Sequence, residues 1–510
     1  MGTIKTDIVV VGAGPTGLAA AWRLAAGGAR VLCIEQGGDF QPPPLEPDDP
    51  AFSSLKRGAL HPNPMIRQDS ADYPVDHAGS PIAPMIGNAV NGGTNYWGAH
   101  IPRFRPDDFE TQRLDGVGAD WPFGYAALAP YYDLYDAKAG AAYRPGAPDL
   151  PPRPTPPRVL PPPYPGAERL SEAFAELGWE AWSVDLARGP DRGPTEPCRH
   201  SGPCDIGCPT WRGALATEGF LSEALENGLQ LMTGTRALRI THDASGRVDG
   251  LVCRRAGEEL TVRAGKVVLA ANGIATPWLM LVSRSDRFPD GIGNGHDQLG
   301  RGMMLHPYAW TRGYVDDLAE RGPGPASSMV CTQFRSFATG SGAKRGIRMQ
   351  SADESRRPRL AGAKTGGWLG ISICAEDLAE PHNRITLSET LRTAEGLPAP
   401  RMEYRLSEAS RKLLDFGMDR AREALLAVGA RAIENEPLVR DAGFHIMGTA
   451  HMGDDPQSSV VDSDCRCHEA PDLVIADASV FVTGSAMNPT ATAAAIALRA
   501  AEGLLRPNHG

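Results

Sequence analysis

The chain has 510 residues, of which 42% are hydrophobic and 22% are charged, as in ordinary globular proteins. Its formal net charge of −10 argues against a protein that holds nucleic acid on a basic surface. No charge-free apolar run reaches the roughly 18 residues that a membrane span needs. The nine cysteines are scattered and odd in number, which favours a reducing compartment, and we expect a cytoplasmic protein.

A glycine-rich turn near the N-terminus lies between two predicted strands. The order is a strand at 7–11, the turn Gly12-Ala13-Gly14-Pro15-Thr16-Gly17, a helix from 18, a strand at 30–34 and then Glu35. In this G-x-G-x-x-G pattern Gly12 makes the tight turn, Gly14 lets the backbone approach a pyrophosphate, and Gly17 lets the helix pack closely on the strand. Glu35 is expected to accept hydrogen bonds from the adenosine ribose. The segment predicts a dinucleotide site at the N-terminus of the helix.

Later segments complete the same nucleotide domain. Strands are predicted at 231–240, 250–253, 266–273 and 473–479, and an alanine-rich helix is predicted from Asn488-Pro489-Thr490 to Leu505, with Pro489 at its first position. A nucleotide domain assembled from such distant segments is typical of large flavoenzymes, so we expect FAD rather than NAD.

The middle of the chain has a different pattern. Residues 145–166 contain eleven prolines and are expected to form an extended surface connector, either a solvated linker or a partner-binding arm. Residues 383–387 and 401–404 look like strands of a substrate-side sheet. Residues 407–428 repeat apolar residues at helical spacing, which predicts an amphipathic helix; the apolar positions are Leu413, Leu414, Phe416, Met418, Ala421, Leu425 and Leu426.

Together these segments resemble the glucose–methanol–choline (GMC) family of FAD-dependent alcohol oxidoreductases. The segments that carry the resemblance are the glycine turn, residues 90–97 (VNGGTNYW), 299–307 (LGRGMMLHP), 444–453 (FHIMGTAHMG), and 477–479 (DAS) leading to 488–490 (NPT). Among relatives, the pattern is most similar to pyranose 2-oxidases and bacterial sugar dehydrogenases.

The resemblance implies an α/β fold with a Rossmann-like FAD-binding domain and a discontinuous substrate domain built on an antiparallel sheet. The expected FAD-binding domain comprises residues 1–38, 80–103, 190–300 and 441–510. The expected substrate domain comprises residues 39–79, 104–189 and 301–440, including the proline-rich connector.

The resemblance also assigns roles to residues. His445 matches the catalytic histidine, and Asn488 matches its partner. The expected FAD contacts are Gly12, Gly14, Gly17, Glu35, Gly92, Gly93, Thr94, Asn95, Ala237, Asp477, Ala478, Pro489 and Thr490, with Ala237 at the adenine and Asp477 and Ala478 near the ribityl and pyrophosphate part.

The sequence departs from the family pattern at two positions. Asn91 replaces a usual glycine in the second FAD loop. Tyr96 stands where pyranose 2-oxidases carry the histidine that bonds covalently to the flavin, so the resemblance implies non-covalent FAD.

The expected chemistry follows from these residue types. A neutral imidazole has an unperturbed pKa of about 6.5, so His445 suits the task of removing the hydroxyl proton while hydride moves to flavin N5. Asn488 would donate a hydrogen bond to the developing alkoxide. His306 is expected to cap a turn before Pro307. For His451, a supporting role beside the catalytic pair and a structural hydrogen bond both stay open.

Two cysteine clusters raise the question of metal binding. Cys198, Cys204 and Cys208 have a spacing similar to that of a three-iron cluster in some bacterial GMC sugar dehydrogenases, with His200 as a fourth candidate. A structural loop with buried thiols is the favoured alternative. Cys465-x-Cys467-His468 has too few nearby ligands for a zinc site, so no metal site is assigned.

The predicted function is oxidation of a hydroxyl on a sugar, glycoside, aminoglycoside or related polyol. The electron acceptor is oxygen in an oxidase, and a quinone, dye-like acceptor or partner protein in a dehydrogenase, which is slightly favoured. The alternatives are a flavin-carrying electron-transfer subunit of a sugar dehydrogenase complex and a redox-neutral family member.

Overall fold

The computed structural model describes residues 2–40, 50–146, 150–188, 217–318, 324–335, 345–354 and 357–506. The helices are α1 Pro15–Ala26, α2 Pro50–Arg57, α3 Pro64–Arg67, η1 Gly92–Tyr96, η2 Pro106–Phe109, α4 Thr111–Asp115, α5 Tyr125–Ala139, α6 Pro165–Glu176, η4 Thr217–Leu221, α7 Ser222–Glu226, α8 Asn272–Val282, α9 Glu408–Ala427, η5 Ala478–Val480 and α10 Thr490–Leu505. The strands are β1 Gly2–Val11, β2 Val31–Ile34, β3 Ala141–Ala142, β4 Ala181–Ser183, β5 Leu186–Ala187, β6 Gln230–Met232, β7 Thr235–His242, β8 Val248–Arg255, β9 Glu258–Leu269, β10 Tyr308–Val315, β11 Met329–Cys331, β12 Ile347–Asp353, β13 Gly367–Ala375, β14 Arg384–Arg392, β15 Pro398–Glu403, β16 Ala432–Glu436 and β17 Leu473–Ile475.

A seven-stranded sheet forms the part of the molecule that carries the glycine turn. Its order is β6-β2-β1-β9-β8-β7, and β17 also pairs with β9. The strands β6, β2, β1, β9 and β17 run parallel, whereas β7 and β8 form an antiparallel extension. The confirmed fold is therefore Rossmann-like at its centre, with the parallel strands buried under helices.

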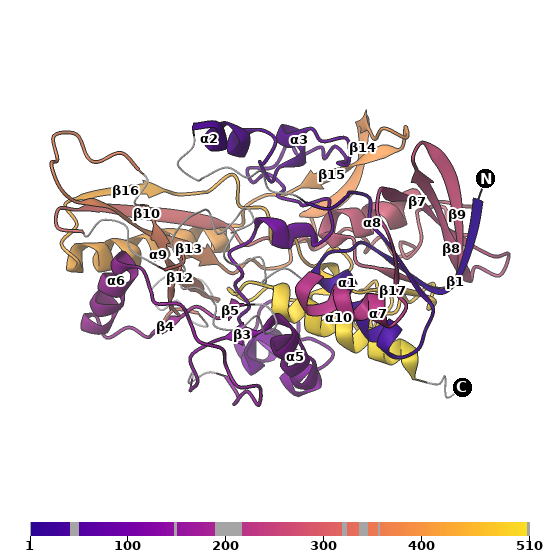
Figure 1. Ribbon diagram of the computed structural model, residues 1–510, viewed down its shortest axis with the longest axis horizontal. Helices are drawn as coiled ribbons and strands as arrows, with labels where there is room; N and C mark the ends of the chain where they lie inside the picture. The colour runs from indigo at the N-terminus through magenta and orange to yellow at the C-terminus, as the bar shows by residue number, and fades with distance from the viewer. Residues whose placement is uncertain are drawn as a thin grey trace.

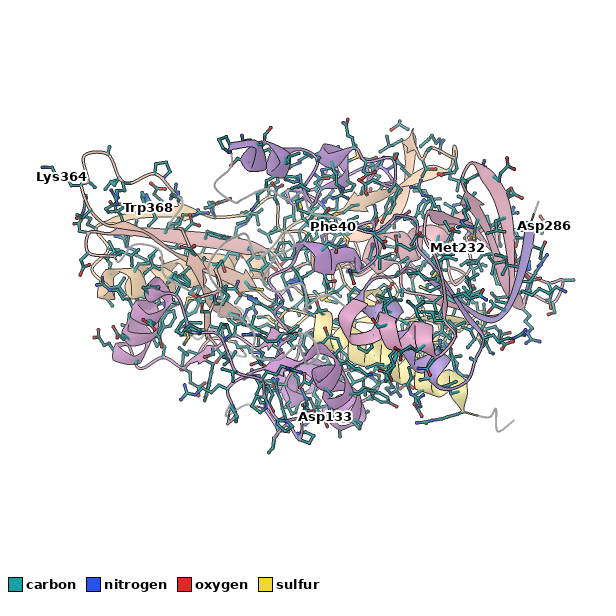
Figure 2. The ribbon with its side chains drawn as sticks, in the orientation of Figure 1. Phe40, Asp133, Met232, Asp286, Lys364 and Trp368 are labelled. Carbon is teal, nitrogen blue, oxygen red and sulfur yellow. The ribbon has the colours of Figure 1, made fainter. Side chains whose placement is uncertain are left out.

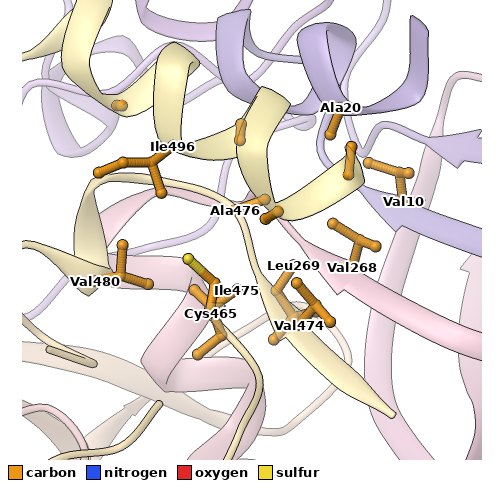
Figure 3. Packing of buried hydrophobic residues seen from close by; sticks show 14 of the residues in the cluster. Val10, Ala20, Val268, Leu269, Cys465, Val474, Ile475, Ala476, Val480 and Ile496 are labelled. Atoms are coloured by element: carbon orange, nitrogen blue, oxygen red, sulfur yellow. The ribbon is translucent and has the colours of Figure 1, made fainter. Parts of the chain in front are cut away.

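The core of this part joins segments from both ends of the chain. Figure 3 shows Val10 of β1, Val268 and Leu269 of β9, Val474 of β17 and Ile496 of α10 as members of one buried cluster. All of these side chains are at most 1% exposed. Helices α1 and α10 pack against each other, so the last helix covers the sheet that the first strand begins.

The second sheet is antiparallel and lies at the opposite end of the molecule (Figure 1). Its order is β16-β10-β13-β12-β11-β4. Because side chains alternate along a strand, the apolar residues of one face pack against α9 and α6. The other face lines the central cavity described below. Figure 2 shows the length of the molecule: Lys364 and Trp368 lie at one end, and Asp286 lies at the other.

The structure corrects several predicted strand bounds. The predicted strand 231–240 is two strands, β6 and β7, because Gly234 takes a left-handed backbone (φ 59°) that breaks the ladder. The predicted strand 473–479 ends at Ile475, since the Asp477 side chain caps the short helix η5. The predicted strand 266–273 ends at Leu269, and Asn272 (φ 75°) begins α8.

The predicted strands at 383–387 and 401–404 do not belong to the substrate-side sheet. They lie in β14 and β15, which form a separate two-stranded ribbon that packs on α8. The amphipathic helix is confirmed as α9, with Ser407 as its N-cap. One apolar position was wrong, because Leu426 is 51% exposed.

The described part of the proline-rich segment contains no strand or helix before α6, and it is fixed by polar contacts. The Arg153 guanidinium forms ion pairs with Asp136 and Asp185, and the Tyr143 hydroxyl donates to the Thr155 carbonyl. Val159 is 85% exposed. The segment is therefore an anchored surface strap rather than a free linker. The division into domains stays a prediction.

Candidate active site

A cavity of about 800 Å³ lies between the two sheets. It is lined by twelve of the predicted site residues: Gly12, Gly14, Glu35, Gly93, Thr94, Ala237, His445, Asp477, Ala478, Asn488, Pro489 and Thr490. Three others, Gly17, Gly92 and Asn95, lie behind its wall. One continuous cavity thus extends from the glycine turn to the His445–Asn488 pair.

The end of the cavity beside the glycine turn has a buried carboxylate. Glu35 is 6% exposed and accepts hydrogen bonds from the backbone N–H groups of Ala13 (2.9 Å) and Gly37 (2.9 Å). Burial raises the pKa of this carboxyl, whereas the backbone donors lower it. Each carboxylate oxygen keeps a second lone pair, so Glu35 can still accept hydrogen bonds from a bound ribose.

The glycines that lie behind the wall allow backbone segments to approach each other. A Cβ on Gly17 would overlap the carbonyl oxygen of Gly12, and a Cβ on Gly92 would lie 3.1 Å from the Cα of Gly14. Asn91, which replaces a usual glycine, has φ 76°, a conformation that asparagine tolerates better than most residues. The Asn95 side chain donates to the Val90 carbonyl (2.9 Å), so it holds the loop that contains it.

Two helix N-termini face the cavity. Gly14 is the N-cap of α1, and Pro489 is the N-cap of α10; neither helix has a side-chain cap. The sequence predicted Pro489 as the first residue of the helix, whereas the helix begins one residue later, at Thr490. Uncapped N-terminal N–H groups and the helix dipole favour anionic groups. Together with the glycine turn and Glu35, they fit an elongated, anionic dinucleotide such as FAD.

Asp477 and Ala237 contribute to the cavity in different ways. The Asp477 carboxylate accepts from the Asn272 N–H (3.0 Å) and the Thr276 hydroxyl (2.6 Å), and so joins η5 to α8. Burial raises its pKa. Ala237 lies next to a register shift in the β7–β8 ladder, where its backbone leaves regular pairing.

The two predicted catalytic side chains meet at the other end of the cavity. The Asn488 Nδ2 atom lies 3.4 Å from the Nε2 atom of His445. His445 is 8% exposed, and Phe444 beside it is 48% exposed. The pair is therefore enclosed, but it lies next to Phe444, a partly exposed residue of the cavity wall.

Arg348, which sequence reasoning missed, fixes the orientation of the Asn488 amide. Its guanidinium, 1% exposed, donates to the Asn488 Oδ1 atom and lies 3.3 Å from the Tyr308 hydroxyl. Because a guanidinium can only donate, Oδ1 must face Arg348, and Nδ2 is left to face His445. Arg348 could not be found from sequence, because it reads as one polar residue in an ordinary strand.

The sequence predicted that His306 caps a turn before Pro307, but the structure gives it a different role. Its ring is fully buried, and its Nδ1 atom lies 2.9 Å from the Nδ1 atom of His445. A third histidine, His100, also lines the cavity near Asn488. The resemblance drew attention to the His306-Pro307 segment, but only the fold places the two rings together.

The environment of His445 favours its neutral form. Burial, and then the positive charge of the nearby Arg348, lower the pKa of His445 well below its ordinary value of 6.5. A desolvated imidazole beside a buried guanidinium is costly to protonate.

The pH dependence of the reaction should reflect this shift. Since a histidine is neutral above its pKa, a lowered pKa keeps His445 able to accept a proton at lower pH. We expect the rate constant for cofactor reduction to stay level as pH falls through 6.5, and to decrease only at lower pH. Anaerobic stopped-flow measurements across pH would check this, and a half-maximal rate near 6.5 would contradict it.

The substrate-side sheet presents a second set of side chains to the cavity. Trp310, Ser372 and Gln350 are paired in register across β10, β13 and β12, and all three line the cavity. The Ser372 Oγ and Gln350 Oε1 atoms are buried and have no hydrogen-bond partner within the described part of the protein. Ser327 also lines the cavity, and its Oγ atom is likewise buried without a hydrogen-bond partner among the described residues. Such atoms are costly unless a ligand or water satisfies them.

The other predicted candidates lie outside this cavity. The His451 Nε2 atom bonds to the Ser458 carbonyl (2.7 Å), a structural contact. Cys198, Cys204 and Cys208 lie outside the described residues. Cys465 and Cys467 are buried thiols, and the described ranges hold no group of three or more His, Cys, Asp or Glu side chains suited to a metal.

Comparison with known proteins agrees with this geometry. Signatures described as GMC oxidoreductase match residues 160–308 and 379–497, and a signature for an NAD(P)-binding Rossmann-like domain matches residues 10–40. A 2-methyl-1,2-propanediol dehydrogenase from Mycolicibacterium austroafricanum is 31% identical, over 98% of this chain and 95% of its own. The chain belongs to the GMC oxidoreductase family. It is therefore an FAD-dependent oxidoreductase that acts on alcohol groups.

Other relatives of this GMC oxidoreductase act on different compounds. A 6'''-hydroxyparomomycin C oxidase from Streptomyces lividus is 32% identical, over 97% of this chain and 90% of its own. Pyridoxine 4-oxidase from Mesorbium loti shares the fold, with a TM-score of 0.65 at 17% identity, over 99% of this chain and 100% of its own. Within the described ranges, none of the helices combines the length and apolar character that crossing a bilayer requires.

Proposed function

We propose that this GMC oxidoreductase oxidises a hydroxyl group of a sugar, glycoside, aminoglycoside or related polyol to a carbonyl, with His445 as the base. The observation that carries the proposal is the pairing of His445 Nε2 with Asn488 Nδ2 on the cavity wall (3.4 Å), within reach of the side chains of the substrate-side sheet. A proton acceptor and a hydrogen-bond donor at this spacing can both reach one substrate oxygen.

His445, Asn488 and Arg348 divide the work at that oxygen. His445 accepts the hydroxyl proton at Nε2, because its lowered pKa keeps the ring neutral. Asn488 donates through Nδ2 to the alkoxide that forms, and Arg348 places a positive charge behind the amide. FAD would be held by the glycine turn, Glu35 and the two helix N-termini, and would supply the acceptor for the hydride.

The sheet residues support a polyhydroxylated substrate. Trp310 offers an aromatic surface, and the unpartnered atoms of Ser372 and Gln350 can exchange hydrogen bonds with hydroxyl groups. An aromatic surface with a few polar groups suits a ring that carries several hydroxyls. The diol and aminoglycoside named for two relatives agree with this class of substrate.

The direct test is anaerobic bleaching of the protein-bound flavin with a panel of sugars, glycosides, aminoglycosides and simple diols. We expect at least one polyol to bleach the flavin at a rate that simple monoalcohols do not reach. Preference for a monoalcohol, or no bleaching by any member, would overturn the proposed substrate class. Comparing oxygen consumption with dye reduction on the same substrate then distinguishes an oxidase from a dehydrogenase.

We expect the FAD to be held without a covalent bond. Tyr96 lines the cavity at the position that would need a histidine to form that bond. The centroid of its ring lies 5.2 Å from that of the Phe40 ring and 5.6 Å from the Cζ atom of Arg67. Denaturation in acid should release all of the flavin into the supernatant. Flavin that stays with the precipitated chain would contradict non-covalent binding.

The Asn488 amide can be tested with two substitutions. Asn488→Leu removes both the donor to the alkoxide and the acceptor of Arg348, whereas Asn488→Asp keeps an oxygen for Arg348 and replaces the donor with a charged acceptor. Loss of one such donor typically costs about 10²–10³-fold in rate. We expect both variants to slow cofactor reduction by that order while FAD affinity changes little. Single-turnover kinetics and flavin titration measure the two quantities, and a normal reduction rate in both variants would exclude the role.

A further inference from the structure

His306 and His445 face each other through the same type of nitrogen, which restricts where their protons can lie. We propose that His306 is a positioning residue that holds the proton of His445 on Nδ1 and thereby leaves Nε2 free to accept the substrate proton. The inference rests on the proposed function, because it concerns how the proposed base is prepared for its task.

The argument begins at the far side of His306. Its Nε2 atom lies 2.7 Å from the Ser485 carbonyl oxygen and 3.2 Å from that of Gly484. Carbonyl oxygens only accept hydrogen bonds, so the Nε2 atom of His306 must carry a hydrogen. In a neutral ring the Nδ1 atom of His306 then holds a lone pair.

That lone pair decides the proton position on His445. The two Nδ1 atoms lie 2.9 Å apart, a hydrogen-bond distance that requires one hydrogen between them. Since the Nδ1 atom of a neutral His306 can only accept, His445 must donate from its own Nδ1. The Nε2 atom of His445 is then the unprotonated nitrogen, and it is the atom that faces Asn488.

The competing arrangement requires a cationic His306. An imidazolium at His306 would donate from Nδ1, and the proton of a neutral His445 would move to Nε2, where it would block the base. Both rings are buried, at 0% and 8% exposure, and the Arg348 guanidinium already places a positive charge beside them. A second buried cation is therefore disfavoured unless a buried anion lies beside it.

The other groups that face the pair come from separate elements. His100 precedes the substrate-side sheet in the chain, and Tyr308 lies on β10. The Cys374 thiol on β13 lies against His306: burial lowers the pKa of His306, but the contact with this thiol raises it, and the pKa of Cys374 is lowered in turn. An ionised Cys374 would favour the cationic His306, so this thiol is the group that could reverse the arrangement.

One short loop contains both Ser485, which bonds to His306, and Asn488, which faces His445. Ser485 has a left-handed backbone (φ 53°), which is unusual for serine and directs its carbonyl to His306. Three residues later the same loop presents Asn488 to the other nitrogen of His445. The loop thus fixes the His445 ring from both sides, once through His306 and once directly.

The experiment reads the proton position itself. FAD-loaded enzyme labelled with ¹⁵N-histidine is examined by NMR, and the His445 signals are assigned by their loss in His445→Gln. We expect Nδ1 of His445 in the range of protonated ring nitrogens and Nε2 in the range of lone-pair nitrogens. A proton on Nε2 of His445 in the unsubstituted enzyme would overturn the proposal.

Two substitutions of His306 provide the matched comparison. His306→Asn places an acceptor oxygen near the former Nδ1 position, whereas His306→Leu removes the acceptor. We expect His306→Leu to lose the single tautomer and to slow cofactor reduction by about 100-fold, with His306→Asn recovering most of that loss. Cys374→Ala should keep the tautomer. A His306→Leu enzyme with unchanged tautomer and rate would contradict the role.

The readouts separate this inference from the proposed function. If the enzyme binds FAD but oxidises no polyol, the proposed substrate class fails, while the nitrogen signals of His445 still decide the proton position. If polyols are oxidised and the proton lies on Nε2 of His445, the substrate class stands, while the positioning role of His306 and the assignment of Nε2 as the proton acceptor both fail.

Discussion

Replacing His445 with alanine is expected to slow alcohol oxidation by about 10²–10⁴-fold while FAD stays bound, because general-base catalysis contributes about that factor. The side chain lies at the reacting end of the cavity, and its Nε2 atom is the proposed proton acceptor. Gly14 and Glu35, which are expected to contact FAD, lie at the glycine turn and should be unaffected. Anaerobic reduction kinetics give the rate, and flavin absorbance per protein gives the occupancy.

A second histidine of the same motif provides the control. His451 bonds to the Ser458 carbonyl and does not line the cavity. We expect His451→Ala to oxidise the substrate at nearly the rate of the unsubstituted enzyme, once any loss of stability is allowed for. If His445→Ala turns over normally with full FAD occupancy, His445 is not the base.

Gly17→Ala is expected to abolish FAD retention and to lower the free energy of unfolding. The added Cβ would overlap the Gly12 carbonyl oxygen and lie 3.2 Å from the Ala270 Cβ atom, and backbone atoms cannot move aside as a flexible side chain can. Overpacking of this kind costs about 1–3 kcal/mol. Flavin content after gel filtration and the denaturant midpoint measure the two effects.

Gly38 offers a matched control at the same end of the cavity. A Cβ on Gly38 would meet no atom within 4 Å, and its backbone is not left-handed. Gly38→Ala should therefore keep both FAD and stability. If Gly17→Ala retained FAD at full occupancy, close packing of α1 on the glycine turn would not be what shapes the phosphate end.

The parts that sequence predicted well are those whose pattern is local. The strands at 7–11 and 30–34 are short apolar runs on either side of a turn with fixed glycine spacing and a helix, and the structure has these elements in that order. The helix at 407–428 was equally clear from its apolar spacing. Strand ends were less predictable, because a left-handed residue such as Gly234 divides an apolar run that otherwise reads as one strand.

The parts that sequence could not predict depend on contacts between distant segments. Arg348 reaches Asn488 across 140 positions, and His306 reaches His445 across 139. Neither contact has a local pattern, because each requires the substrate-side sheet and the loop before α10 to be in place. The ribbon of β14 and β15 was assigned to the wrong sheet for the same reason: alternation shows that a strand exists but not which neighbour it joins.

The strand β9 carries a consequence for how the protein matures. It pairs with β1 along its length and, on its other side, with β8 first and then with β17. When only the first 300 residues have emerged from the ribosome, the sheet therefore still lacks strand β17 and the covering helix α10. We expect nascent chains to hold the cofactor poorly until synthesis reaches α10, so that capture of FAD is a late, post-translational event.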